Sequence, residues 1–181
     1  VLEFLGNEAL AVDQGLFADV GVRHLIFKRI ADLDVVAEDL VIAHLHVFDA
    51  EGRLYLQHRP SWKKIQPNRW DTAVGGHIGY GETVAEALER EAYEELGLSG
   101  FEAASIEQYV YESTCEREFV HVFCTRTAVA PTPSAELDGG AFFTHEEIVE
   151  QLGKGFFTPM FEAEWQQLSQ LECFRRYECG E

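Results

Sequence analysis

The chain has 181 residues, of which 46% are hydrophobic and 25% are charged. This length favours one domain, and the composition excludes disordered, collagen-like and low-complexity chains. The 14 Lys and Arg against 32 Asp and Glu give a formal charge of −18. Such a charge repels polyanions, so non-specific nucleic-acid binding is not expected.

Membrane and secretion signals are not apparent in the sequence. No stretch approaches the roughly 18 consecutive apolar residues of a membrane span. Residues 1–5 lack the basic segment and apolar run of a signal peptide. No C-x-x-C spacing relates the four cysteines, Cys115, Cys124, Cys173 and Cys179. We therefore expect reduced thiols and a cytoplasmic location.

Strand patterns dominate the chain from residue 40 onward. Residues 40–48 are apolar and β-branched, turn residues follow, and residues 53–58 alternate again, which predicts a β-hairpin. Further strands are predicted over residues 70–77, 105–113, 118–129 and 141–143. Both alternating rows of the segment 118–129 hold apolar residues, which predicts that this strand is covered on both faces.

Two helices are predicted near the C-terminus. Thr144 with Glu147 three residues later has the pattern of a capping box, for a helix that ends about residue 152. Thr158 followed by Pro159 is typical of a helix start, because proline at the first turn costs no hydrogen bond. The apolar stripe of this last helix is Phe161, Trp165, Leu168 and Leu171.

The segment GHIGYGETVAEALEREAYEELGL, residues 76–98, combines a strong helix signal with unusual charges. Thr83 and Glu86 form a capping-box pattern and Gly97 is a stop signal, which predicts a helix over residues 84–96. Its apolar face continues toward the C-terminus through three acids, Glu91, Glu94 and Glu95. The pattern therefore predicts burial for acidic side chains.

These acids are unfavourable for stability alone. The helix dipole costs about 0.3–1 kcal/mol per exposed acid in the last turn, and desolvation of an unpaired carboxylate costs more. A bound hard cation would resolve this, since Glu at i, i+3 and i+4 converge and Mg²⁺ or Mn²⁺ takes oxygen ligands. The alternative is a solvated acidic helix face in which Arg90 pairs with Glu86 and Glu94.

The whole constellation resembles the box of the Nudix hydrolase family, G-x5-E-x7-R-E-U-x-E-E-x-G-U with U apolar. Every fixed position is filled, by Gly76, Glu82, Arg90, Glu91, Ala92, Glu94, Glu95, Gly97 and Leu98. The resemblance implies an α/β Nudix fold, an α/β/α sandwich with a mixed central β-sheet. We expect the Nudix domain over residues 40–181, with residues 1–39 as an N-terminal extension packed on it.

A looser resemblance points to the branch of the family that contains isopentenyl diphosphate isomerase. It is carried by residues 66–82, Glu136-Leu137, Phe142-Phe143-Thr144 and Phe157-Thr158-Pro159. In that isomerase a catalytic cysteine stands two residues before a histidine that corresponds to His77. This chain has Gly75 at the position of the cysteine. The isomerase box also usually lacks the complete pair of glutamates that is present here as Glu94 and Glu95. The resemblance thus implies a hydrolase-like member of this branch.

The resemblance also implies roles for the box. Metal binding falls to Glu91, Glu94, Glu95 and the carbonyl of Gly75, with Mg²⁺ or Mn²⁺ as the cofactor. The substrate would be a small-molecule diphosphate, such as a nucleoside diphosphate derivative, attacked at phosphorus by water. Glu91 or Glu94 is the first candidate for the general base, and Arg90 would orient the glutamates. Structural support is expected from Gly76, Glu82 and Gly97.

Substrate contacts are expected upstream of the box. Residues 53–69 hold five of the 14 Lys and Arg, and Arg59, Lys63 and Lys64 are the candidates for phosphate contacts. Solubility of a long loop is the alternative explanation. His77, inside the box loop, is a further candidate.

Two acids at the start of a predicted strand, Glu116 and Glu118, could add a metal ligand or the general base. A solvated strand end explains them equally well. A transition-metal site is not expected, because no ligand spacing relates His44, His46, His58, His77 and His121.

Two other functions stay open. Isopentenyl diphosphate isomerase activity is disfavoured by Gly75, and a non-catalytic nucleotide-binding module is disfavoured by the intact acids of the box. We assign no function to residues 1–39, for which a cover over the pocket and a homodimer contact are both open.

Overall fold

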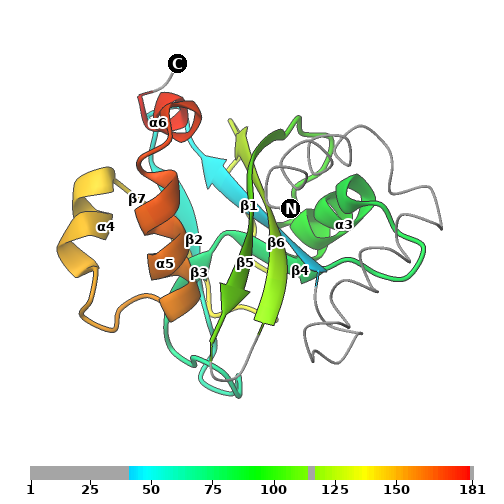
Figure 1. Ribbon diagram of the computed structural model, residues 1–181, viewed down its shortest axis with the longest axis horizontal. Coiled ribbons are helices and arrows are strands. Elements are labelled where there is room, and N and C mark those ends of the chain that lie inside the picture. The colour runs from blue at the N-terminus through cyan, green and yellow to red at the C-terminus, as the bar shows by residue number, and fades with distance from the viewer. Residues whose placement is uncertain (1–40, 114–116, 180–181) are drawn as a thin grey trace, which may run out of the picture.

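The computed structural model describes residues 41–113 and 117–179 (Figure 1). Expectations for residues 1–39, Cys115 and Glu116 lie outside these residues. One seven-stranded sheet has the order β3-β2-β1-β6-β5, with β4 paired to β1 and β7 paired to β2. The strands are β1 Val41–Phe48, β2 Leu54–His58, β3 Trp70–Thr72, β4 Val74–His77, β5 Ala104–Glu112, β6 Arg117–Arg126 and β7 Gly140–Phe143.

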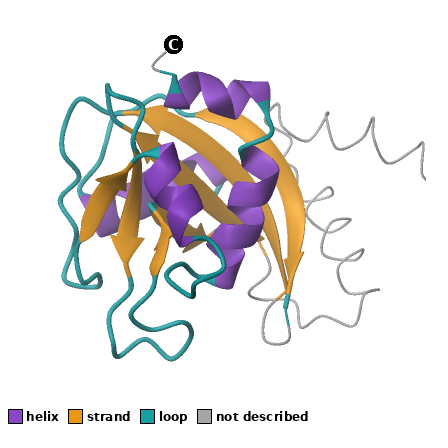
Figure 2. Ribbon diagram, turned by 90° about the vertical axis from the view of Figure 1, so that its left-hand side faces the viewer, coloured by secondary structure: helices purple, strands orange, loops and turns teal. Residues whose placement is uncertain are grey.

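Helices cover both faces of this sheet. They are α3 Val84–Leu96, α4 His145–Gln151, α5 Pro159–Leu168 and α6 Glu172–Glu178. α3 lies on one face, and α4, α5 and α6 lie on the other (Figures 1 and 2). The strands β1 and β6 are parallel and the other paired strands are antiparallel. The chain therefore has the expected α/β/α sandwich around a mixed sheet.

β1 is buried because it contributes to the cores on both faces. Ile42 and Phe48 belong to the apolar cluster that includes α4, α5 and α6. Ala43, Leu45 and Val47 belong to the cluster that includes α3. Successive side chains of a strand point to opposite faces, so this alternation places His44 and His46 on the α5 face.

The sheet divides next to β1. On one edge β1 pairs with β6 along its whole length. On the other edge it pairs with β4 at residues 42–45 and with β2 only at residues 47–48. β2 and β3 thus separate from β4, and the candidate site lies where they separate.

The local helix signals are confirmed. α3 spans the predicted residues, with a capping box at Thr83 and Gly97 in the left-handed conformation at its end. α4 has the predicted capping box between Thr144 and Glu147.

In the described part of the chain, no helix is long and apolar enough to cross a membrane.

Other details of the sequence prediction were wrong. The segment 70–77 forms two strands, because the chain changes partner from β2 to β1. Leu171 lies beyond α5, which ends at Leu168, and α6 was not predicted. The buried face of α3 continues through Ala92 and Leu96, whereas the Glu94 side chain is 58% exposed.

Candidate active site

The box loop is fixed to the start of α3 by local hydrogen bonds. The Glu86 amide donates to Thr83 Oγ1 at 3.2 Å, and the Thr83 amide donates to the Glu86 carboxylate at 2.8 Å. Glu82 accepts from the amide of Gly79 at 2.8 Å. The loop therefore reaches the helix in one defined path.

Arg90 connects this loop to the acids of the box. Its Nε and Nη2 donate to the two oxygens of Glu82 at 2.8 and 2.9 Å. Its Nη1 donates to Glu91 at 2.7 Å and to Glu94 at 3.2 Å, and Nη2 also reaches the carbonyl of His77. Arg90 therefore joins Glu82, Glu91 and Glu94 in one hydrogen-bonded network.

Two glycines of β4 bring the backbone close to the acids of α3. A Cβ atom at Gly76 would overlap the side chain of Glu91, so only glycine leaves room for this carboxylate. The amide of Gly75 donates to Glu95 Oε2 at 3.3 Å, and Gln57 Nε2 reaches the same oxygen at 3.3 Å. Burial raises the pKa of Glu95 to about 8, because desolvation penalises the charged form.

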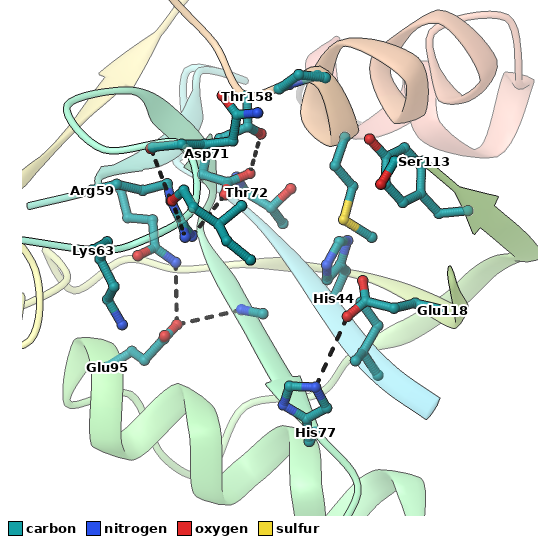
Figure 3. Close-up of a pocket in the computed structure, with 18 residues that line it drawn as sticks. His44, Arg59, Lys63, Asp71, Thr72, His77, Glu95, Ser113, Glu118 and Thr158 are labelled. Carbon is teal, nitrogen blue, oxygen red and sulfur yellow. Dashed lines mark hydrogen bonds and ion pairs between the residues drawn. The ribbon is translucent and has the colours of Figure 1, made fainter. Parts of the chain in front are cut away.

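A pocket of about 380 Å³ opens beside these strands (Figure 3). Its lining includes six of the residues chosen from the sequence: Arg59, Lys63, Gly75, His77, Glu95 and Glu118. Glu91 and Glu94 do not line it; their carboxylates are turned to Arg90. Lys64 is exposed and is also absent from the lining.

The basic loop above the pocket is held by Arg59. This side chain donates to Asp71 at 3.2 Å and to the carbonyls of Gln66 and Ile65 at 3.2 and 3.0 Å. Lys63 Nζ makes no hydrogen bond or ion pair with the described residues and lies 5.1 Å from the centroid of the Trp62 ring. Lys63 is therefore better placed than Arg59 to meet a ligand.

His77 and Glu118 face each other across the pocket (Figure 3), with 3.9 Å between His77 Nε2 and Glu118 Oε1. The Glu118 side chain is only 14% exposed. Glu118 comes from β6, Glu95 from α3 and Asp71 from β3, so the pocket has carboxylates on three elements.

The donor set suits a hard cation. Glu91, Glu94, Glu95 and the Gly75 carbonyl offer only oxygen, which Mg²⁺ and Mn²⁺ prefer. A cation would also favour the charged form of Glu95, which burial opposes. Within residues 41–113 and 117–179, however, no three acidic, histidine or cysteine side chains already converge as a metal cluster. Arg90 contacts only Oε1 of Glu91 and Oε2 of Glu94, so each carboxylate keeps one oxygen for a cation.

The sequence around this site matches a known protein family. A family model described as NUDIX domain matches residues 38–163, which is most of the chain. The chain belongs to the Nudix family.

Similar Nudix proteins differ in their names. An isopentenyl-diphosphate Delta-isomerase of Streptomyces griseus is 35% identical over 122 residues, which cover 64% of this chain and 62% of the isomerase. An uncharacterized Nudix hydrolase of Yersinia pestis is 31% identical over 117 residues, covering 64% of this chain and 63% of that protein. The chain thus spans less than two thirds of the length of each relative.

A solved structure supports the same fold. The NUDIX domain of Shewanella oneidensis NrtR complexed with ADP ribose has a TM-score of 0.61 and 10% identity. The match covers 79% of this chain and 96% of that domain. At this identity the similarity shows the Nudix fold alone.

The sequence analysis missed the pocket wall on the α5 side. His44 lines the pocket, and its Nδ1 lies 2.9 Å from Glu164, a fully buried residue of α5. A signal was present, because Glu164 lies among Phe161, Trp165 and Leu168 on the apolar face of α5. An acid on such a face needs a buried partner.

Proposed function

We propose that this Nudix protein hydrolyses a diphosphate linkage, by attack of water at phosphorus, with Mg²⁺ or Mn²⁺ as cofactor. The substrate class we propose is a nucleoside diphosphate derivative or a related compound. The observation that carries the proposal is the position of Glu95 in a pocket that also contains Lys63. An anionic diphosphate in this acidic chain requires positive charge, which Lys63 and a metal together supply.

The acids of α3 would hold the metal together with the carbonyl of Gly75. When bound, a divalent ion offsets the charge of the diphosphate and lowers the pKa of the attacking water. Glu91 or Glu94 then accepts the proton of that water, and Arg90 holds both carboxylates before reaction. Glu118 is the alternative base, since it already lines the pocket.

The two basic residues that line the pocket have different roles in this proposal. Lys63 provides a cation for a phosphate group, whereas Arg59 holds the loop that carries Lys63 through Asp71, Gln66 and Ile65. We therefore propose Lys63 as the direct phosphate contact and Arg59 as a positioning residue. His77, 60% exposed at its side chain, is available to a ligand at the pocket mouth.

Isomerisation of isopentenyl diphosphate is the second candidate, favoured by the similarity to the Streptomyces griseus isomerase. The pocket chemistry disfavours it. Gly75 occupies the position of the isomerase cysteine, and none of the described residues lining the pocket is a cysteine. Incubation with isopentenyl diphosphate distinguishes the two reactions, because isomerisation exchanges the double bond without releasing phosphate.

A screen for cleavage of the diphosphate linkage, in which chromatography separates the phosphorylated products, tests the proposed hydrolysis. The panel contains nucleoside diphosphates and triphosphates, dinucleoside polyphosphates, nucleotide sugars, coenzyme A and prenyl diphosphates, each with Mg²⁺ and with a chelator. We expect turnover that requires the metal and falls on the order of 10²-fold in Glu95→Gln. Exposed Glu89 of α3 offers the matched control Glu89→Gln, which should keep full turnover. Metal-independent cleavage, or no cleavage of any compound, would contradict hydrolysis, and tight nucleotide binding without cleavage would favour a non-catalytic module.

A further inference from the structure

Glu164 is a buried carboxylate outside the box whose hydrogen bonds are well satisfied. Its Oε1 lies 2.7 Å from His46 Nε2, and its Oε2 lies 2.9 Å from His44 Nδ1. Tyr109 donates its hydroxyl to Oε2 at 2.6 Å, and Thr72 reaches Oε1 at 3.4 Å. Glu164 has no exposed surface, so these donors replace water around the charge.

The two histidines that share Glu164 point to different places. The ring of His46 is wholly buried and meets the ring of Phe174 edge-on, with 5.5 Å between centroids. His44 instead lines the pocket, where Figure 3 shows its ring near Glu118. His44 Nδ1 faces Glu164, while Nε2 has no hydrogen-bond partner among the described residues. A ligand in the pocket is therefore the available partner for Nε2.

Because Gly75 has no side chain, the Nε2 edge of the His44 ring is left open. A Cβ atom at Gly75 would lie 3.3 Å from both Cδ2 and Nε2 of His44. The free nitrogen thus faces β4 next to the amide that contacts Glu95. A diphosphate bound near Glu95 and Lys63 would place its attached group within the part of the pocket that His44 lines.

The fixed imidazole favours a hydroxyl group over a hydrocarbon. Hydrogen bonding to Glu164 restricts the ring, so Nε2 occupies one position and little entropy is lost on binding. A hydroxyl donates or accepts, and it therefore pairs with either protonation state of the ring. A hydrocarbon would leave the buried Nε2 without any partner, at a cost of about ten- to a hundredfold in affinity.

We propose that His44, oriented by Glu164, is a substrate-recognition residue that hydrogen-bonds a hydroxyl of a sugar attached to the diphosphate. The pocket thereby selects sugar-bearing diphosphates over prenyl diphosphates. Ile42 and Met160, which also line the pocket, provide aliphatic surface for the carbon face of the sugar. The inference takes the diphosphate ligand from the proposed function, but recognition by His44 is a binding property and needs no turnover.

Calorimetric titration of the full chain in the presence of Ca²⁺, which takes oxygen ligands as Mg²⁺ does, tests this directly. The probes are ADP, its dideoxy analogue, isopentenyl diphosphate and inorganic pyrophosphate. The wild-type protein should bind ADP about tenfold or more tightly than the other three. Equal affinity for ADP and its dideoxy analogue, or for ADP and isopentenyl diphosphate, would overturn the inference without any variant.

Variants then locate the effect. His44→Phe keeps an aromatic ring but removes Nε2, so ADP affinity should fall about tenfold while pyrophosphate affinity stays unchanged. His44→Gln retains a polar amide and should recover part of the loss. The matched control is His46→Phe, which also removes one donor from Glu164 but lies outside the pocket lining, and it should keep the preference for ADP. Equal loss of preference in both phenylalanine variants would contradict recognition by His44.

The same samples separate this inference from the proposed hydrolysis. Phosphate release is measured with Mg²⁺ after each titration. Preference for ADP without release would refute hydrolysis and leave recognition standing. Release from ADP and isopentenyl diphosphate with equal kcat/KM would refute recognition and leave hydrolysis standing.

Discussion

Arg90 donates two parallel hydrogen bonds to Glu82, from Nε to Oε1 at 2.8 Å and from Nη2 to Oε2 at 2.9 Å. This fork ties the middle of α3 to the loop that precedes it. The remaining donor, Nη1, reaches Glu91 and Glu94. One guanidinium thus sets both the loop and the acids that we propose as metal ligands.

Arg90→Lys should therefore reduce activity more than stability. An ammonium cannot form the planar fork, and small displacements of catalytic groups cost on the order of 10²-fold in rate. The free energy of unfolding should fall by only about 1 kcal/mol, because the pair is partly exposed. Phosphate release and urea unfolding measure the two effects. Arg176→Lys, in the exposed pair with Glu172 on α6, is the control and should change neither. Full kcat in Arg90→Lys would contradict this role.

Gly76→Ala should remove activity while the fold persists. The new methyl group would occupy the position of the Glu91 carboxyl group, which would have to move. We expect kcat to fall on the order of 10²-fold and the free energy of unfolding to change by about 1 kcal/mol or less. Gly140→Ala provides a contrast, because its methyl group would meet the buried ring of Tyr55 and should destabilise the protein. An active Gly76→Ala protein would show that Glu91 needs no such space.

Glu164→Gln should destabilise the protein by about 3–5 kcal/mol near neutral pH, as expected when one member of a buried ionic network is lost. Burial opposes ionisation of Glu164, but His44 and His46 outweigh it and lower the pKa of Glu164 below its ordinary value of 4.5. A carboxyl group with a lowered folded pKa stabilises the fold above its unfolded pKa. The difference in free energy of unfolding between the wild type and Glu164→Gln should therefore shrink as the pH falls below 4.5. Urea unfolding of both proteins across this range measures it, and a pH-independent difference would exclude an ionised Glu164.

Local signals explain what the sequence predicted well. The ends of α3 depend on Thr83, Glu86 and Gly97, all within the helix or next to it, so the pattern alone defined them. The apolar run of β1, the turn residues after it and the alternation in β2 likewise predicted their antiparallel pairing. The box motif then implied the fold around them.

Contacts distant in sequence explain what was missed. His44 and Glu164 are 120 residues apart, and only the packing of α5 on the sheet brings them together. The division of residues 70–77 into two strands depends on which neighbour each half meets. Glu94 is exposed because the buried face of α3 continues through Ala92 and Leu96, whereas helical periodicity alone predicted that it continues through Glu94.

Metal binding is the most direct test of the account, because every proposed catalytic role depends on it. Paramagnetic resonance of free Mn²⁺ can be followed during titration with the wild-type protein, Glu95→Gln and the control Glu89→Gln, each with and without ADP. We expect the wild type and the control to bind Mn²⁺, more tightly with ADP, and Glu95→Gln to bind about ten- to a hundredfold more weakly. Identical titrations for all three proteins, with ADP present, would contradict a metal held by the acids of α3.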